Sequence, residues 1–250
     1  MNGHIATVNV TGTTFLALTA PRLITGLWLG CILLWEWSSA DLWIMNLLAD
    51  HHGFALRHDW WLRVVLHDGL HTVSVLCYLA LIIAIWQPLG FMRATSRLQR
   101  VEMLIGVTAS LLSISWIKYS SLTSCPWDLA EFGGMARYVS HWAWGLADDG
   151  PGRCFPSGHA SAGFAFLALA LPGLFSASAG VRQEGWRMFY LMLLFGLTCG
   201  ITQVLRGAHY PSHVLWTGLI CWAVALVNHL TFKTLRRPPV ILDQGSPDPS

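Results

Sequence analysis

Three long stretches without a formally charged residue constrain the fold of this chain more than any other feature. They run over residues 69–92, 154–181 and 207–232. An α-helix that crosses the hydrocarbon core of a bilayer needs about 20 predominantly apolar residues, so each stretch is long enough. Three shorter apolar stretches, over 23–35, 103–117 and 188–205, are bordered by charged side chains that can reach the interface. The sequence therefore predicts an all-α, polytopic membrane protein with six transmembrane helices.

The composition excludes the main alternatives. Hydrophobic residues make up 54% of the chain and charged residues 11%, whereas soluble domains carry roughly 25% charged residues. A disordered chain would lack this apolar content, and a net charge of +2 argues against a broad basic surface for nucleic acid. We expect a single membrane domain over residues 1–235. Residues 236–250, which contain Pro, Asp and Ser, are expected to form a disordered cytoplasmic tail.

The basic residues predict an orientation. With both termini in the cytoplasm, nine of the 15 Lys and Arg residues fall on the inner side: Arg22, Arg93, Arg97, Arg100, Arg182, Arg187, Lys233, Arg236 and Arg237. This bias is typical of cytoplasmic loops. We therefore expect a bacterial inner (plasma) membrane protein whose third and fifth helices lead into loops on the periplasmic or outer face. The first 20 residues carry no Lys or Arg ahead of their apolar part, which is untypical of a cleavable signal peptide.

The unusual polar residues gather in three segments, each at a predicted outer helix end: residues 118–128, 153–159 and 203–213. Together they supply cations, imidazoles, hydroxyls and a glycine beside a helix start. Cations and backbone N–H groups at a helix N-terminus bind phosphate. A neutral His can attack phosphorus, and a protonated His can give a proton to the leaving oxygen. The segments therefore predict phosphate chemistry at the outer ends of the helices.

The run Pro156-Ser157-Gly158-His159 resembles the second motif of the type-2 phosphatidic acid phosphatase superfamily. The membrane members of that superfamily have six helices and three motifs at one membrane face: K-x6-R-P, P-S-G-H and S-R-x5-H-x3-D. The resemblance extends over residues 118–230 by motif, and four positions of the family pattern are changed. In the first motif Lys118 and Pro126 match, and Cys125 replaces Arg; in the third His209 matches, and Thr202, Gln203 and His213 replace Ser, Arg and Asp.

The resemblance implies roles for individual residues. His209 would be the nucleophile that forms a phosphohistidine, and His159 the acid that protonates the leaving group. Lys118 and the backbone of Ser157 and Gly158 would hold the phosphoryl oxygens. The substitutions remove two arginines and one carboxylate of the family pattern. The sequence offers Arg153 and Arg206 as replacement cations and His213 as the group that orients His209. Asp128 and Glu131 are alternative sources of negative charge.

Two further questions stay open at this point. Cys125 and Cys154 both lie in the outer motif segments, so an oxidising compartment permits a disulfide, with two free thiols as the alternative. His209 and His213 also have the i, i+4 spacing of a metal pair, but no H-E-x-x-H occurs, and we expect neither a metal nor a cofactor. Histidines outside the motifs are expected to be solvated interfacial residues: His51, His52, His58, His67 and His141.

The sequence thus predicts a phosphatidic acid phosphatase-type hydrolase that cleaves a phosphate monoester or pyrophosphate on a lipid. Its partners would be the phosphorylated lipid and the membrane lipids, with no nucleic acid and no obligate protein partner. A lipid phosphotransferase that uses the same histidine is an alternative, as is a non-catalytic phospholipid-binding or transport protein. Phosphatidic acid, phosphatidylglycerophosphate, undecaprenyl pyrophosphate and lipid A phosphates all fit as ligands.

Overall fold

A computed structural model describes residues 10–236, with side chains from Pro21 onward; most of the predicted C-terminal tail lies outside these residues. The chain is mostly helical. Its α-helices are α1 (Val10–Trp37), α2 (Ala40–Leu48), α3 (Leu70–Ala84), α4 (Arg97–Ser120), α5 (Gly158–Phe164), α6 (Leu171–Leu174), α7 (Ala179–Leu205) and α8 (Pro211–Leu235). A π-helix, η1 (Trp61–Gly69), leads into α3. Strands β1 (Ala49–Asp50) and β2 (Gly53–Phe54) form a short antiparallel pair, and 3-10 turns cover Gly90–Ala94, Pro126–Asp128, Ala130–Phe132 and Ala165–Leu169.

Four of the described helices are long and apolar enough to cross a membrane: Trp61–Ala84, Arg97–Ser120, Ala179–Leu205 and Pro211–Leu235. A fifth span arises if the pair Pro21–Trp37 and Ala40–Leu48, bent by 70°, counts as one. These helices indicate a membrane-embedded protein. The helix predicted over 69–92 begins earlier, at Trp61, and ends sooner, at Ala84. It ends ahead of Pro88, which has no N–H to donate and disfavours a helical conformation at the preceding residue.

The structure differs most from the prediction over residues 154–181. The segment Gly158–Leu174 is helical there, as α5, a 3-10 turn and α6, and it is shorter than the other spans; α7 begins only at Ala179. Every residue from 160 to 172 is buried inside the bundle. A segment that is apolar all round is typical of a buried helix as well as of a membrane span. The long uncharged run therefore reflects burial among the other helices.

Close backbone contact holds this short segment against α7. A Cβ atom placed on Gly163 would lie 2.4 Å from the backbone nitrogen of Gly196, and one on Gly173 would lie 2.8 Å from the Cα of Gly185. Small residues let helix backbones approach in this way. The segment 158–174 is thereby fixed in the centre of the molecule.

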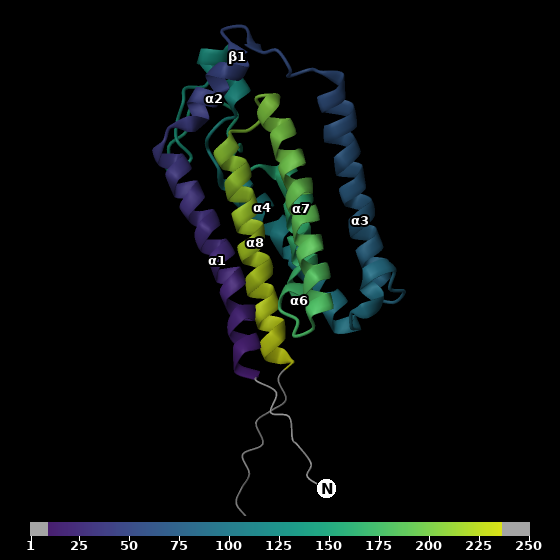
Figure 1. Ribbon diagram of the computed structural model, residues 1–250. Helices are drawn as coiled ribbons and strands as arrows, with labels where there is room; N and C mark the ends of the chain where they lie inside the picture. Colours follow the sequence, from purple (N-terminus) through teal and green to yellow (C-terminus); the bar gives the residue numbers. More distant parts are fainter. Residues whose placement is uncertain (1–9, 237–250) are drawn as a thin grey trace, which may run out of the picture.

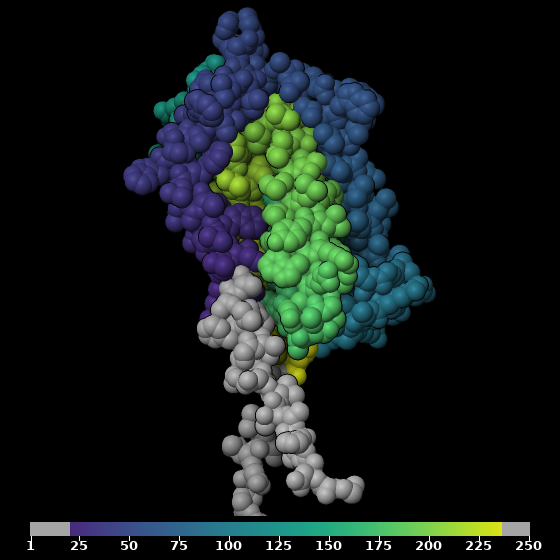
Figure 2. All heavy atoms as spheres, viewed as in Figure 1, coloured from purple at the N-terminus to yellow at the C-terminus, as the bar shows by residue number. Residues whose placement is uncertain are grey.

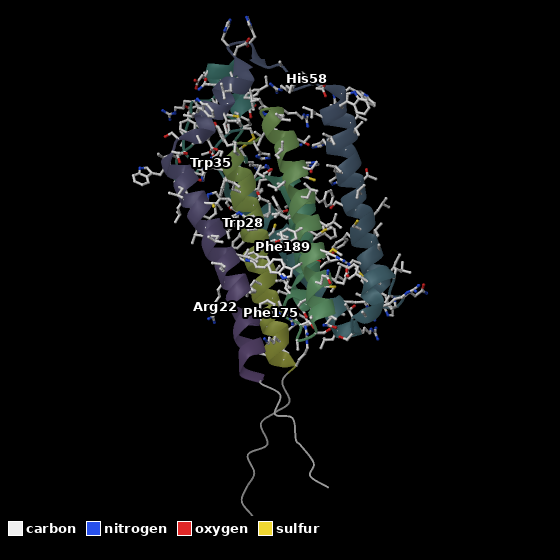
Figure 3. All side chains as sticks on the ribbon, viewed as in Figure 1. Arg22, Trp28, Trp35, His58, Phe175 and Phe189 are labelled. Atoms are coloured by element: carbon white, nitrogen blue, oxygen red, sulfur yellow. A yellow bond between two sulfur atoms is a disulfide. The ribbon has the colours of Figure 1, made fainter. Side chains whose placement is uncertain are left out.

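Helix α8 lies between α1 and α7, and α3 lies on the far side of α7 (Figure 1). Figure 2 shows that α8 is recessed between these two neighbours on the face in view. The fully buried Trp222 of α8 donates its Nε1 hydrogen to Thr25 Oγ1 of α1 at 2.8 Å. Its ring lies edge-on to Phe189 of α7, with centroids 5.4 Å apart, and Figure 3 shows Phe189 between the two helices.

The two ends of the bundle differ in what they carry. The start of α1 and the end of α8 lie together at one end, and α2 and β1 lie at the other (Figure 1). At the α2 end, the backbone N–H of Ser212 in the first turn of α8 donates to Asp41 Oδ1 at 3.0 Å. The 206–210 connection between α7 and α8 reaches this same end (Figure 1). Lys118, in the last turn of α4, lines one cavity with Ala208 and His209 of that connection. We call the α2 end the outer end, and the opposite one the inner end.

Candidate active site

A cavity of about 620 Å³ lies at the outer end and receives residues from every predicted motif. Its walls come from η1 and α3, the end of α4, the following loop, α5, and the end of α7 with its connection to α8. The lining residues are His67, Asp68, His71, Thr72, Lys118, Cys125, Trp127, Gly158, His159, Ala162, Gln203, Ala208 and His209. Three of the predicted site residues that face one another here, Lys118, His159 and His209, are up to 91 positions apart (209 − 118) in the sequence.

The Lys118 side chain lines the cavity and packs against the start of α5. A Cβ atom on Gly158 would lie 3.4 Å from Cδ and 3.6 Å from Cε of Lys118. The absence of a side chain at Gly158 therefore gives the lysine stem its place. Within residues 21–236, no carboxylate lies within salt-bridge distance of this lysine. Its charge is thus available to an anion in the cavity.

The start of α5 is fixed from α8. Thr217 Oγ1 donates to the Ser157 carbonyl at 3.1 Å, and the Ser157 N–H donates to the His213 carbonyl at 3.4 Å. Ser157 is fully buried, and its hydroxyl has no hydrogen-bond partner among the described residues. The predicted phosphate-binding backbone of Ser157 and Gly158 is therefore held rigidly, with Gly158 in the cavity wall.

His159 lies in the first turn of α5 and is covered by His67, which the sequence predicts to be a solvated interfacial residue. The His67 ring stacks on the His159 ring with centroids 4.1 Å apart and an interplanar angle of 12°. The ring centroid of His71, one helical turn after His67, lies 6.5 Å from that of His159. Within the described part of the chain, His159 Nε2 is buried without a hydrogen-bond partner. A donor or acceptor on a bound ligand would satisfy it.

The α3 side of the cavity was missed by sequence reasoning. His67 Nδ1 lies 2.7 Å from Asp68 Oδ1, and His67 and His71 have the same i, i+4 spacing as the motif histidines. That spacing, beside Asp68 at the edge of an apolar stretch, is the signal that could have found them. The π-helical turn itself, of a kind frequent at functional sites, is visible only in the structure. The contact with α5 is tertiary and has no signature in the sequence.

His209 lies in the connection between α7 and α8, where Gly207 makes the turn. Gly207 has φ +74°, and a Cβ there would lie 2.4 Å from the Phe54 ring. The His209 side chain is buried. Burial, followed by the nearby charges of Lys118 and His159, holds the pKa of His209 well below its usual range, and a backbone hydrogen bond with Cys154 opposes this. A neutral imidazole with a free lone pair is the form that a nucleophile requires.

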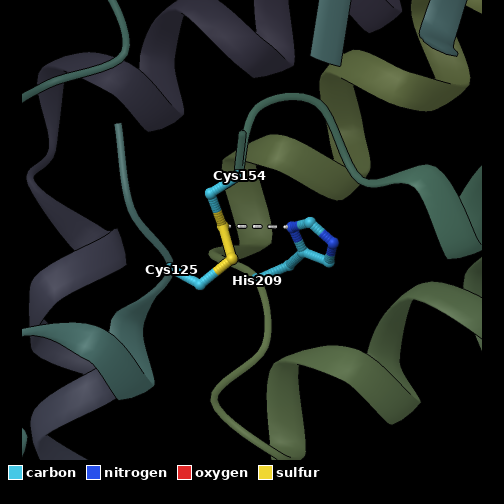
Figure 4. A group of neighbouring side chains, drawn as sticks. All are labelled: Cys125, Cys154 and His209. Carbon is cyan, nitrogen blue, oxygen red and sulfur yellow. Dashed lines mark hydrogen bonds between the residues drawn. A yellow bond between two sulfur atoms is a disulfide. The ribbon is translucent and has the colours of Figure 1, made fainter. Parts of the chain in front are cut away.

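Cys125 and Cys154 form a disulfide beside His209 (Figure 4). Cys154 Sγ lies 3.5 Å from His209 Nδ1. Cys125 is positioned by the preceding residue, because the Ser124 backbone N–H and hydroxyl both donate to the buried carboxylate of Asp148. The sequence reasoning did not single out Asp148, whose partner is 24 positions away.

His213 meets a different partner from the predicted His209. Its Nδ1 lies 3.2 Å from the Cys154 carbonyl oxygen, and its ring centroid lies 5.9 Å from that of His209. Its orienting role stays a prediction. Of the alternative carboxylates, neither Asp128 nor Glu131 lines the cavity.

The two candidate arginines lie outside the cavity wall. Arg206 Nε donates to the Arg57 carbonyl at 3.3 Å, and its NH1 to Gln203 Oε1 at 3.4 Å. Because Gln203 does line the cavity, Arg206 stands directly behind that wall. Arg153 is exposed and stacks over the Tyr119 ring at 4.6 Å, so in this structure it does not reach the site.

The comparisons with known proteins agree with the motifs. No curated protein and no solved structure matches the chain. A sequence profile of the PAP2 superfamily matches residues 100–237, which is more than half of the chain and includes Lys118, His159 and His209. This confirms the family indicated by the motifs and supports phosphatase-type activity on phosphate esters. The chain therefore belongs to the PAP2 superfamily, whose members are phosphatases.

Proposed function

We propose that this protein hydrolyses a phosphate monoester or pyrophosphate carried by a membrane lipid, through a phosphohistidine at His209. The observation that carries the proposal is the convergence of Lys118, His159 and His209 on one cavity at the outer end. Binding alone needs a cation, but it does not need a buried neutral imidazole opposite a second imidazole. This pairing favours catalysis over a purely binding role.

In the first step the phosphate lies between Lys118 and the backbone at Ser157 and Gly158, with Arg206 adding charge from behind Gln203. His209 attacks phosphorus in line, forming a P–N bond as the P–O bond to the lipid breaks. Protonated His159 gives its proton to the departing lipid oxygen. The negative charge of the bound phosphate favours the imidazolium form of His159 that this step requires.

In the second step, neutral His159 takes a proton from water, and the resulting hydroxide attacks phosphorus. The P–N bond breaks, inorganic phosphate leaves, and His209 is neutral again. Little covalent chemistry is asked of the protein beyond this, so positioning and charge supply most of the acceleration. Since Cys125 and Gln203 stand where the family pattern has arginines, fewer cations face the phosphate, and we expect a slow enzyme.

The lipid assignment rests on the surroundings of the cavity. Helix η1–α3, which forms one wall, exposes large apolar side chains along its length, including Trp61, Leu76 and Ile83. A lipid headgroup can enter such a site while its tails stay in the bilayer. We further propose six membrane passes, the short buried segment 158–174 being one of them, and a bacterial inner membrane location. The excess of basic residues at the inner end supports cytoplasmic termini and a site that faces the periplasm or the outside.

The test is phosphate release by the purified protein in detergent with EDTA present. The panel contains phosphatidic acid, phosphatidylglycerophosphate, undecaprenyl pyrophosphate, a lipid A phosphate and one soluble phosphoester. Release from a lipid that disappears in both His209→Ala and His159→Ala supports the proposal. Transfer of phosphate to a second lipid or sugar, in place of release, would assign the phosphotransferase reaction. Binding without release or transfer would contradict both.

A further inference from the structure

Cys154 contacts both histidines of the third motif. Its Sγ lies 3.5 Å from His209 Nδ1, and its carbonyl oxygen lies 3.2 Å from His213 Nδ1. Its own N–H donates to the Thr123 carbonyl at 2.9 Å, which ties it to the loop that follows α4. Cys154 is fully buried. One residue thus connects the first, second and third motifs.

The disulfide contact favours one of the two tautomers of His209. A sulfur in a disulfide has no hydrogen of its own, so it can only accept. The contact at Nδ1 is therefore a hydrogen bond only if Nδ1 carries the hydrogen, and the lone pair then lies on Nε2. Figure 4 shows this second nitrogen on the side of the ring away from the disulfide. This is the tautomer that attacks through Nε2.

No carboxylate competes for this position. Among the described residues, no carboxylate oxygen lies within hydrogen-bond distance of His209, and no acidic group is among the charges that act on it. His213, which replaces the family's Asp, is engaged with the Cys154 carbonyl. Of the side chains in the described structure, the disulfide is the one that meets His209 Nδ1.

We propose that the Cys125–Cys154 disulfide is a positioning element for His209, holding its ring with the hydrogen on Nδ1 and the lone pair on Nε2. This inference rests on the proposed function, because it takes His209 as the nucleophile. The sulfur fixes orientation and tautomer, but it carries no charge to stabilise the cationic phosphohistidine.

Breaking the disulfide adds a hydrogen-bond donor at Cys154. Dithiothreitol gives two electrons and two protons to the S–S bond, which yields two protein thiols and the cyclic disulfide of the reagent. A Cys154 thiol can donate its hydrogen to Nδ1. That bond favours the hydrogen on Nε2 and removes the lone pair from the attacking nitrogen. Activity should therefore depend on the oxidised state.

The test compares oxidised and dithiothreitol-treated protein in detergent, with thiols counted to verify that the bond is broken. EDTA is present because ligand atoms of Cys125, Cys154 and His209 lie within 4.8 Å of one another, and freed thiols there would capture a metal. We expect kcat for phosphate release to fall at least about tenfold, as expected when the wrong tautomer is held, with KM changing less than about threefold. Cys125→Ala/Cys154→Ala should be slow with or without reductant. Cys199→Ala, which removes a buried free thiol of α7, should respond to reductant as the wild type does.

A purely structural role is separated by two further readings. Binding of vanadate and the thermal midpoint show whether the reduced protein remains folded. Histidine-selective 15N NMR, with the His209 signals identified by their loss in His209→Ala, reports the tautomer directly. We expect Nδ1–H in the oxidised protein and a shift toward Nε2–H on reduction. An unchanged kcat and tautomer in folded, fully reduced protein would overturn the inference.

The NMR reading also keeps this inference separate from the proposed function. It does not require turnover. If no substrate is hydrolysed but the tautomer changes on reduction, the proposed function fails and the positioning role of the disulfide stands. If hydrolysis through His209 proceeds and its tautomer does not change on reduction, the proposed function stands and the positioning role of the disulfide fails.

Discussion

The outer and inner ends of the bundle both contain buried histidine and charged side chains. At the inner end these side chains pair with one another, whereas at the outer end they face a cavity. Helices α4 and α8 contribute to both ends. At the inner end, Glu102 of α4 meets His229 of α8, with Nδ1 and Oε1 2.5 Å apart, and the other Glu102 oxygen pairs with Arg236. At the outer end, Lys118 and His209 face an open cavity without a carboxylate partner among the described residues.

The inner cluster is closed by packing as well as by charge. Phe175 stacks on the His229 ring with centroids 4.5 Å apart, and it lies beside the lower part of α8 in Figure 3. Asn228 donates to the Glu102 carbonyl at 2.9 Å. Among the described residues, both His159 Nε2 and His229 Nε2 are buried without a hydrogen-bond partner, but His159 lines the outer cavity, where a ligand can meet it, whereas His229 is enclosed by packing. The comparison teaches that buried charge by itself does not mark the active site.

The largest predicted difference between the two ends is in activity. His209→Ala should lower phosphate release at least about 10³-fold, because removal of a nucleophile leaves only binding and charge stabilisation. The matched inner-end variant, His229→Ala, should keep kcat within about twofold of the wild type, since it touches no part of the cavity. Steady-state assays of both variants, corrected for folded fraction, measure this. Comparable losses in the two variants would break the distinction.

The second prediction reverses the comparison and concerns stability. Glu102→Ala leaves His229 and the Arg236 guanidinium without their partner. Loss of one member of a buried ion pair costs about 3 kcal/mol, at the low end of its range because Arg236 is partly exposed. Unfolding curves in detergent, alongside the exposed-pair control Glu184→Ala, for which about 0–1 kcal/mol is expected, measure the effect. Equal stability of the two variants would show that the inner cluster is not a structural element.

A smaller effect is expected on the α3 side of the cavity. His67→Ala and His71→Ala should each raise KM for the phosphorylated lipid by about three- to tenfold, with kcat less affected, since they line the cavity without carrying the reaction. His58, on the exposed loop before α3 (Figure 3), is the matched control and should not change KM when replaced by Ala. A fall in kcat without a change in KM would instead place His67 in the chemistry.

The smallest expected effect is a displacement of the pH profile. The pKa of His209 lies well below 6.5, the ordinary pKa of histidine. The imidazole therefore stays neutral as the pH falls through 6.5. The acidic limb of kcat/KM should therefore lie below pH 6.5. An acidic limb at or above this value would mean that His209 titrates as a solvated histidine, contrary to its burial.

The sequence predicted the motif residues of the cavity better than the packing of the helices around them. Lys118, His159 and His209 could be found because their spacing matches a family pattern, and they do converge. The contribution of α3 could not be found, since the stacking of His67 on His159 depends on tertiary packing. Likewise, the apolar run at 154–181 predicted a helix but not its burial, because composition alone does not separate lipid contact from protein contact. The pairing of Cys125 with Cys154 was one of two open readings, whereas the contact of that pair with His209 Nδ1 followed only from the fold.

Trapping of the phosphoenzyme tests the central claim most directly. The purified protein would be mixed with a 32P-labelled lipid substrate, quenched in alkaline denaturant within milliseconds to seconds, and digested to locate the label. The account predicts an alkali-stable, acid-labile phosphate on His209 of the wild type during turnover, and no such label in His209→Ala. Steady turnover without label at His209, or label on His213 instead, would contradict it.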